Sequence, residues 1–295
     1  MKWTADQIPD QTGRTAIVTG ANAGIGYETA RALAHRGARV ILACRSRERG
    51  EAAVARIRGE GAEVELALLD LASLASVRAF AQAFLESGAA LHLLINNAGV
   101  MIPPASKTED GFELQIGVNY LGHHALTGLL LSRLLETPGA RVVTVSSLAH
   151  RQGRIDLGSF HGERPYKGWR EYCQSKLACL VFTLELQRRL EASGAGVISV
   201  AAHPGGTKTD LQRHNKLLDV FTTIAAMSAP KGALPTLYAA TAPDVAGGAY
   251  FGPRGPYELI GYPAPAHIAR RAQDAEVARA LWETAEKLTG VRYLS

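Results

Sequence analysis

The chain has 295 residues, 47% of them hydrophobic and 20% charged, which is typical of a folded globular protein and long enough for a large hydrophobic core. No stretch approaches the roughly 18 consecutive apolar residues of a membrane span, and the first residues lack the apolar segment of a secretory signal, so we expect a cytoplasmic protein. The net charge of +5 comes from arginines scattered along the chain, which argues against nucleic-acid binding.

Short β-branched runs alternate with longer segments of helical periodicity. The expected strands are 15–19, 39–43, 64–69, 91–95, 141–146 and 197–201. The expected helices are 28–36, 47–58, 74–86, 112–135, 172–191 and 274–288. Because crossovers between parallel strands must pass over a face of the sheet, this alternation predicts a single α/β domain over residues 1–295. We expect a Rossmann-type doubly wound parallel sheet with helices on both faces.

Three segments depart from this alternation. Residues 148–171 form a polar connection ahead of the fifth helix, and residues 252–266 are rich in glycine and proline. The apolar stretch 217–227 suits either a mobile lid helix or an ordinary core helix. We expect a C-terminal substrate lid, with substrate-contacting segments at about 210–230 and 252–270.

A glycine-rich turn follows the first strand and opens a helix. Glycines let the backbone turn tightly and approach a pyrophosphate, while the helix N-terminus offers unpaired N–H groups and the positive end of its dipole. A strand before and a helix after are the context that supports a dinucleotide site. The residues expected to form it are Gly20, Asn22, Ala23, Gly24, Ile25 and Gly26.

The residues that end the second strand bear on which dinucleotide binds. An NAD-binding site usually places a carboxylate there for the ribose 2′-hydroxyl, but this chain has Cys44 followed by Arg45. A guanidinium can bind a 2′-phosphate with two hydrogen bonds, so we predict NADP(H) as the cofactor. A solvated arginine at a strand end would give the same sequence.

Tyr172 and Lys176 lie four residues apart, which places both on one face of a helix. A neighbouring ammonium favours the charged form of a phenol, so the pair suits proton transfer. An amphipathic helix with a solvated lysine has the same spacing.

These motifs, taken in order, resemble the short-chain dehydrogenase/reductase family. The glycine turn has the spacing Gly20-xxx-Gly24-x-Gly26. The further marks are Asp70-Leu71, Asn96-Asn97-Ala98-Gly99, Asn119, Ser147, Tyr172-xxx-Lys176 and Pro204-Gly205-xxx-Thr209. In their details the motifs look most like the retinol-dehydrogenase-like and WW-domain-oxidoreductase-like branch. One departure is Ala23, where many NADP-preferring relatives carry a basic residue.

The resemblance implies roles for the motif residues. Asp70 and Leu71 would meet the adenine, and Asn97, Ala98 and Gly99 would line the dinucleotide groove. The segment with Pro204, Thr207 and Thr209 would orient the nicotinamide carboxamide, and Tyr172 and Lys176 would contact the nicotinamide ribose.

The resemblance also implies a catalytic group of Asn119, Ser147, Tyr172 and Lys176. Tyr172 would be the general acid or base, Lys176 would stabilise its phenolate, and Ser147 would bind the substrate oxygen. Asn119 would position a water that relays protons to Lys176. Ser147 is preferred over the adjacent Ser146 because the second serine of such a pair is the usual catalytic one.

We therefore expect an NADP(H)-dependent oxidoreductase that acts on a small apolar aldehyde, ketone or alcohol. An NADP-binding isomerase or lyase and a non-catalytic NADP sensor remain as alternatives. The histidines and the three cysteines lack metal-ligand spacing, so no metal site is expected. The resemblance also implies pairing through helices 112–135 and 172–191 to give a homodimer or homotetramer, which the C-terminal tail could block.

Overall fold

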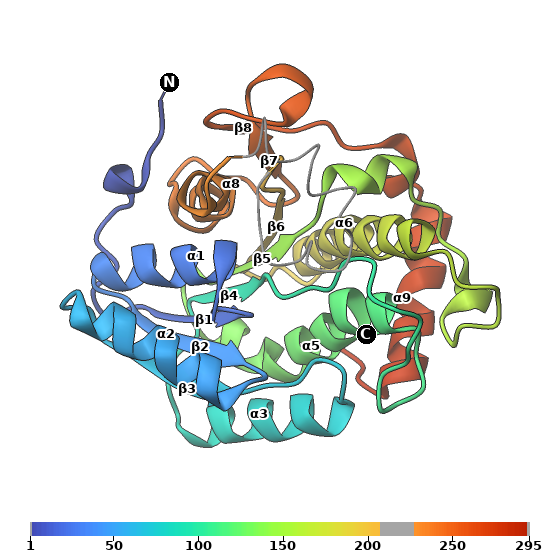
Figure 1. Cartoon of the computed structure of the whole chain (residues 1–295), viewed down its shortest axis with the longest axis horizontal. Coiled ribbons are helices and arrows are strands. Elements are labelled where there is room, and N and C mark those ends of the chain that lie inside the picture. Colours follow the sequence, from blue (N-terminus) through green and yellow to red (C-terminus); the bar gives the residue numbers. More distant parts are fainter. Residues whose placement is uncertain (1, 207–226, 294–295) are drawn as a thin grey trace.

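The structure is a computed structural model that describes residues 2–206 and 227–293. Within these residues one sheet has eight strands in the order β3-β2-β1-β4-β5-β6-β7-β8 (Figure 1). The strands are β1 (Thr15–Thr19), β2 (Arg39–Cys44), β3 (Val64–Leu68), β4 (Leu93–Asn96), β5 (Arg141–Val145), β6 (Ile198–Ala202), β7 (Tyr250–Pro253) and β8 (Pro263–Pro265). All neighbours from β3 to β7 are parallel, and β8 is an antiparallel edge strand.

The order of the strands reverses direction at β1, which pairs with β2 on one side and with β4 on the other. The loops that leave the carboxyl ends of β1 and β4 therefore diverge. A crevice at such a switch point is where open α/β sheets bind their ligands.

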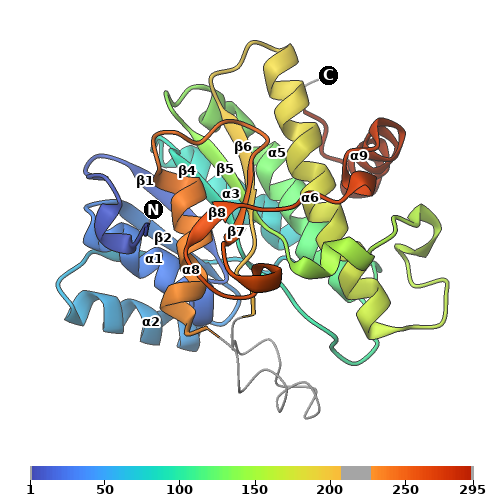
Figure 2. The same cartoon turned by 90° about the horizontal axis from the view of Figure 1, so that it is seen from above.

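Helices cover both faces of the sheet, as predicted (Figure 2). The strand β1 alternates between them, since Ile17 packs on one side while Ala16 and Val18 pack on the other. One face holds α1 (Gly24–His35), α2 (Arg47–Gly59) and α8 (Ala229–Thr241). The other holds α3 (Leu74–Glu86), α5 (Gly122–Leu135) and α6 (Gly168–Ala192), with α9 (Ala275–Thr289) packed on α5 and α6. None of the helices in the described ranges is long and apolar enough to span a membrane.

The predicted helix 112–135 is not one continuous α-helix. It consists of a short turn α4 (Leu114–Ile116), a π-helical turn η2 (Gly117–Leu121) and α5. A π-helical turn has i→i+5 bonds and is frequent at functional sites. Here it carries Asn119, which is buried.

The C-terminal part differs most from the sequence-based expectation. The glycine- and proline-rich segment 252–266 contains the end of β7, the short 3-10 turn η6 (Pro256–Glu258) and β8. Helix α8 was not expected, because Pro235 interrupts its pattern. The predicted lid stretch 217–227 lies outside the described residues except for Met227.

Helix α9 covers the helices through which a dimer was expected. Trp282 of α9 stacks on Phe182 of α6, with ring centres 5.9 Å apart. Every residue from Glu171 to Thr183 is buried within the single chain. A homodimer or homotetramer remains a prediction, and pairing through α5 and α6 would require α9 to move away.

Candidate active site

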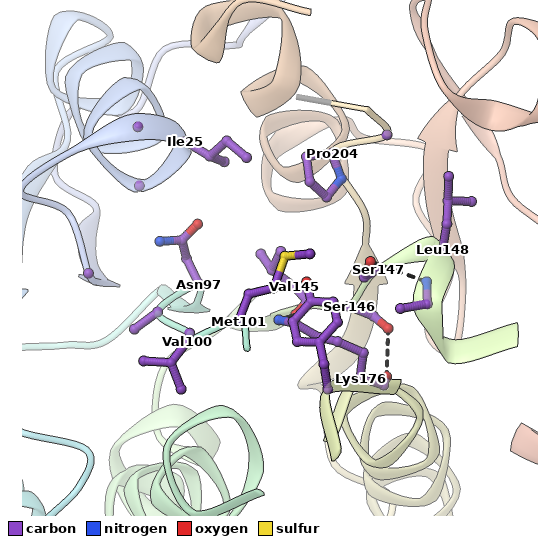
Figure 3. A pocket seen from close by; sticks show the side chains of 18 of the residues that line it. Ile25, Asn97, Val100, Met101, Val145, Ser146, Ser147, Leu148, Lys176 and Pro204 are labelled. Carbon is purple, nitrogen blue, oxygen red and sulfur yellow. Dashed lines mark hydrogen bonds between the residues drawn. The ribbon is translucent and has the colours of Figure 1, made fainter. Parts of the chain in front are cut away.

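A pocket of about 390 Å³ lies at the carboxyl ends of the central strands (Figure 3). Five chain segments form its walls, and they come from the ends of β1, β4, β5 and β6 and from the start of α6. The predicted site residues that line it are Gly20, Asn22, Ala23, Gly24, Ile25, Gly26, Asn97, Ala98, Gly99, Ser147, Tyr172, Lys176 and Pro204. The fold thus brings the expected dinucleotide turn and the Tyr172–Lys176 pair into one cavity.

The glycine turn needs its glycines for two different reasons. Gly20 and Gly24 have φ values of 66° and 56°, which side chains other than glycine rarely adopt. Gly26 is needed for space, since a Cβ on it would lie 2.5 Å from the carbonyl oxygen of Gly20 and would collide with the Asn97 amide. The backbone of this turn is therefore packed closely against the loop that follows β4.

The N-terminus of α1 fits a bound phosphate. Its N-cap is Ala23, which has no side-chain acceptor for the first N–H groups. In contrast, α2, α3 and α9 are capped by the side chains of Ser46, Ser73 and Asp274. A helix N-terminus without a capping side chain leaves its amides and the positive end of its dipole available for an anion.

Thr19 fixes the groove wall next to this turn. Its hydroxyl oxygen accepts hydrogen bonds from the backbone N–H groups of Asn97 and Ala98, both at 2.9 Å. The Asn97 side chain donates to the carbonyl oxygen of Thr19 at 2.8 Å. These contacts hold the loop after β4 against the end of β1, which gives the crevice a rigid edge.

Three predicted cofactor residues do not line the pocket. Arg45 is exposed directly after β2, where its side chain is free to approach a ligand that extends beyond the pocket. The Asp70 carboxylate accepts a hydrogen bond from the N–H of Ala72 at 2.9 Å. Leu71 is buried in the hydrophobic core, so it could contact an adenine only through its backbone.

Thr207 and Thr209 lie outside the described residues. Their neighbour Pro204 lines the pocket together with Gly205 and Gly206.

Tyr172 and Lys176 are both buried on the first turns of α6. The Lys176 ammonium donates to the carbonyl oxygen of Val145 at 3.0 Å and lies 6.0 Å from the centre of the Tyr172 ring. Helix α6 begins at Gly168, four residues before Tyr172. Gly168 has no room for a side chain, since a Cβ there would lie 3.2 Å from the Tyr166 hydroxyl and would meet Ile102. The close packing of this first turn sets the position of Tyr172 at the pocket wall.

The two adjacent serines have different surroundings. Ser146 is buried and its hydroxyl donates to the carbonyl oxygen of Lys176 at 2.7 Å. Ser147 is partly exposed in the pocket, where its oxygen accepts from the N–H of Ala149 at 3.2 Å (Figure 3). A hydroxyl that only accepts still has its proton to donate to a ligand.

Asn119 lies behind the pocket wall and does not line it. Its side-chain oxygen accepts from the N–H of Val100 at 2.7 Å, and its amide donates to the Val100 carbonyl at 3.0 Å and to Ser175 at 2.9 Å. Its backbone carbonyl accepts from His123 at 3.0 Å. Asn119 therefore clamps the loop that carries Gly99 and Val100, and its role in a water relay remains a prediction.

Several pocket residues were not among those assigned to the site from the sequence. They are Val100, Met101, Val145, Ser146, Leu148, Ala149, Trp169, Gly205 and Gly206. Most of them are apolar and directly follow predicted motif residues. Their position next to a motif in the sequence could therefore have identified them as pocket residues. Trp169 is three residues before Tyr172, and its ring centre lies 5.9 Å from that of Tyr172.

Four histidines have their side chains inside the fold. His123, His124, His150 and His203 are at most 2% exposed. Burial lowers the pKa of His123 to about 4, because a charged ring would lose its hydration. Its ring nitrogens bond to Thr19 at 2.9 Å and to the carbonyl of Asn119. This ring therefore links the end of β1 to the π-helical turn.

Comparison with known proteins identifies the family. The sequence profile described as short chain dehydrogenase matches residues 14–217. Retinol dehydrogenase 12 of Homo sapiens is 43% identical over 294 residues, covering 97% of this chain and 89% of that protein. The chain belongs to the short-chain dehydrogenase family of oxidoreductases, and its predicted likeness to retinol dehydrogenases is confirmed.

Solved structures agree with this assignment. A crystal structure of an uncharacterised protein from Mycobacterium paratuberculosis is 46% identical, with a TM-score of 0.85 and 99% of each chain covered. The Pseudomonas aeruginosa RhlG/NADP active-site complex is 25% identical, with a TM-score of 0.66, and the match covers 81% of this chain and 94% of that one. The predicted single-domain Rossmann-type fold is thereby confirmed.

Proposed function

We propose that this protein is an NADP(H)-dependent oxidoreductase that interconverts an apolar aldehyde or ketone with the corresponding alcohol. One observation carries the proposal. A single pocket joins the uncapped N-terminus of α1 to the side chains of Ser147, Tyr172 and Lys176. Such a pocket can hold a dinucleotide along one wall and a carbonyl group at the other end.

In this proposal the nicotinamide group supplies or accepts the hydride. Tyr172 gives a proton to the carbonyl oxygen during reduction and takes it back during oxidation. Ser147 donates a hydrogen bond to the same oxygen, which stabilises the negative charge that develops there. Lys176 is held by the Val145 carbonyl, so its positive charge stays near the phenol and the nicotinamide ribose.

The walls around Tyr172 support an apolar substrate. The side chains of Val100, Met101, Leu148 and Trp169 line the pocket. Val100 and Met101 come from the loop after β4, Leu148 from the turn η3 and Trp169 from the first turn of α6, and this composition is typical of sites for apolar ligands. The relative named above is called a retinol dehydrogenase, and retinol is itself an apolar alcohol. The segments at about 210–230 and 252–270 are proposed as the remaining substrate walls.

The preference for NADP(H) rests on Arg45. Its exposed position after β2 lies at the strand end where a carboxylate would select NAD. The RhlG structure is an NADP complex. We also propose that residues 1–295 form one NADP(H)-binding domain and that the enzyme is cytoplasmic.

The proposal can be tested by following NADPH absorbance with a panel of apolar aldehydes and ketones. We expect oxidation of NADPH by wild-type protein. We expect less than about 1% of that rate for Tyr172→Phe with unchanged NADPH affinity, because positioning remains while the proton donor is lost. Conversion of substrate without net oxidation would instead indicate an isomerase or lyase. Binding of NADPH without turnover of any panel member would indicate a sensor.

A further inference from the structure

Glu258 lies in the glycine- and proline-rich segment, far along the chain from the motif residues, and its carboxylate accepts two hydrogen bonds and forms one ion pair. Its Oε2 lies 2.7 Å from Nη2 of Arg151 and 3.1 Å from Nε2 of His203. Its Oε1 accepts from the N–H of His267 at 3.1 Å. These partners lower the pKa of Glu258 to about 2 despite partial burial. The carboxylate is therefore charged at neutral pH, and both of its oxygens have partners.

His203 connects Glu258 to the pocket. The backbone N–H of Gly205 donates to Nδ1 of His203 at 3.2 Å. Nδ1 is thus the acceptor, and Nε2 carries the proton that is donated to Glu258. The ring is completely buried and lies over Gly252, where any Cβ would collide with it. The orientation of Gly205, which lines the pocket, is therefore set by Glu258 through one imidazole.

Arg151 connects the same carboxylate to the opposite wall. It lies in the 3-10 turn η3 (Leu148–Gln152), and this turn begins directly after Ser147. The Ser147 side chain caps the turn by accepting from the N–H of Ala149. The ion pair of Arg151 with Glu258 therefore helps to fix the position of this turn and of the Ser147 hydroxyl that caps it.

The backbone of the Glu258 loop is shaped to make these contacts. Tyr257 and Glu258 have φ values of 53° and 59°, which residues with a side chain rarely adopt and which are concentrated at functional sites. The next residue, Leu259, accepts from the N–H of Gly206 at 2.8 Å. Gly205 has a φ of 67°, and a Cβ on it would lie 2.7 Å from Pro253. In this conformation the loop is thus packed closely against the pocket wall.

We propose that Glu258 is a positioning residue for the reaction, joining the turn that carries Ser147 to the segment His203–Gly206 and so fixing two walls of the pocket relative to each other. We call the group Arg151, His203 and Glu258 the clasp. The inference rests on the proposed function, because the two walls that the clasp joins are those between which the nicotinamide and the carbonyl oxygen would meet. Glu258 itself does not line the pocket.

Steady-state kinetics of Glu258→Ala and Arg151→Ala test the clasp. We expect kcat to fall about ten- to hundredfold, because small displacements of reacting groups are costly. The NADPH dissociation constant should change less than about threefold, since the phosphate turn is untouched. The double variant should be no slower than the slower single variant, because both remove the same link. Glu258→Gln, which keeps one acceptor oxygen and the shape of the side chain, should retain an intermediate kcat.

Glu65→Ala is the matched control. It removes an ion pair with Arg39, whose Nε lies 2.6 Å from the Glu65 carboxylate, on strands far from Ser147. A kcat in Glu258→Ala within twofold of wild type would overturn the proposal, as would additive losses in the double variant. The proposal would also be overturned if Glu65→Ala and Glu258→Ala lowered the melting temperature and kcat by equal amounts, because general destabilisation would then explain the loss of kcat.

Amide hydrogen exchange separates the clasp from the proposed activity. We expect faster exchange at Gly205 and Gly206 in Glu258→Ala, and no change there in Glu65→Ala. Unchanged exchange at both glycines would overturn the clasp. This measurement needs no turnover. If the wild-type protein reduced no carbonyl compound, the proposed function would be refuted, but the exchange experiment could still test the clasp.

Discussion

The ammonium nitrogen of Lys176 lies 6.0 Å from the centre of the Tyr172 ring and is held by a 3.0 Å hydrogen bond to the carbonyl oxygen of Val145. Val145 is the last residue of β5, and Ser146 and Ser147 follow it directly. One strand end therefore anchors the lysine and presents the serine. The relative positions of the three polar groups depend on the sheet as much as on the spacing along α6.

The two serines after β5 should respond differently to replacement by alanine. Ser147→Ala removes the hydroxyl that faces the pocket, so we expect kcat to fall about hundredfold, as on loss of one oxyanion donor. Ser146→Ala removes a buried bond to the Lys176 carbonyl, so we expect a loss of about 1 kcal/mol in the free energy of unfolding with kcat within a few-fold of wild type. Kinetics and urea unfolding measure both. Equal effects on kcat would refute the choice of Ser147.

Arg45→Ala tests the choice of dinucleotide. Loss of a charge-assisted bond to a 2′-phosphate costs about 1.5–3 kcal/mol, so KM for NADPH should rise about ten- to hundredfold while KM for NADH changes little. Arg279→Ala is the control, because Arg279 is an exposed arginine on α9. Wild-type kcat/KM values that are equal for NADPH and NADH would contradict the role of Arg45.

Much of the fold and the candidate site could be predicted because the signals are local. The glycine spacing requires particular φ values at Gly20 and Gly24, and the spacing of Tyr172 and Lys176 places both on one helical face. The strands up to β6 were found because they are short, largely apolar runs that alternate with segments of helical periodicity. The order of the motifs then located the pocket.

The remaining features depend on contacts that leave no local pattern. The π-helical turn at Asn119 is a change in backbone bonding within a sequence of helical periodicity. Strands β7 and β8 are short and contain glycine or proline, which normally indicate loops. The clasp joins Arg151 and Glu258 from separate segments. Only the three-dimensional structure brings such residues together.

Gly26→Ala should damage the cofactor site, although Gly26 has an ordinary φ. An added Cβ would lie 2.5 Å from the carbonyl oxygen of Gly20 and would meet the Asn97 amide, so we expect NADPH binding to weaken by at least about tenfold as the turn shifts. Gly59→Ala is the control, because its Cβ would meet nothing within 4 Å at the end of α2. That change should raise the free energy of unfolding by up to about 1 kcal/mol. Undiminished NADPH binding in Gly26→Ala would contradict the prediction, because it would show that the glycine turn can accommodate the added Cβ.

His124→Phe should stabilise the protein, and more so in mild acid. The ring is completely buried among the aromatic side chains of Phe182, Trp282 and Tyr293, and neither nitrogen has a hydrogen-bond partner among the described residues. Burial lowers the pKa of His124 to about 3. As the pH falls below about 6.5 the unfolded chain takes up a proton that the folded chain does not. The free energy of unfolding therefore decreases from about pH 6.5 down to about pH 3, and phenylalanine removes that decrease.

Urea unfolding at two pH values measures this effect. We expect His124→Phe to gain about 1 kcal/mol at pH 7.5, because an unpaired polar ring is replaced by an apolar one, and about 2 kcal/mol more at pH 5 from the proton linkage. His123→Phe is the contrasting variant, since both nitrogens of His123 are hydrogen-bonded to Thr19 and Asn119. It should lose stability at pH 7.5, because Thr19 and Asn119 each lose one buried hydrogen bond. A His124→Phe variant that is less stable than wild type at pH 5 would mean that the His124 ring nitrogens are bonded in solution.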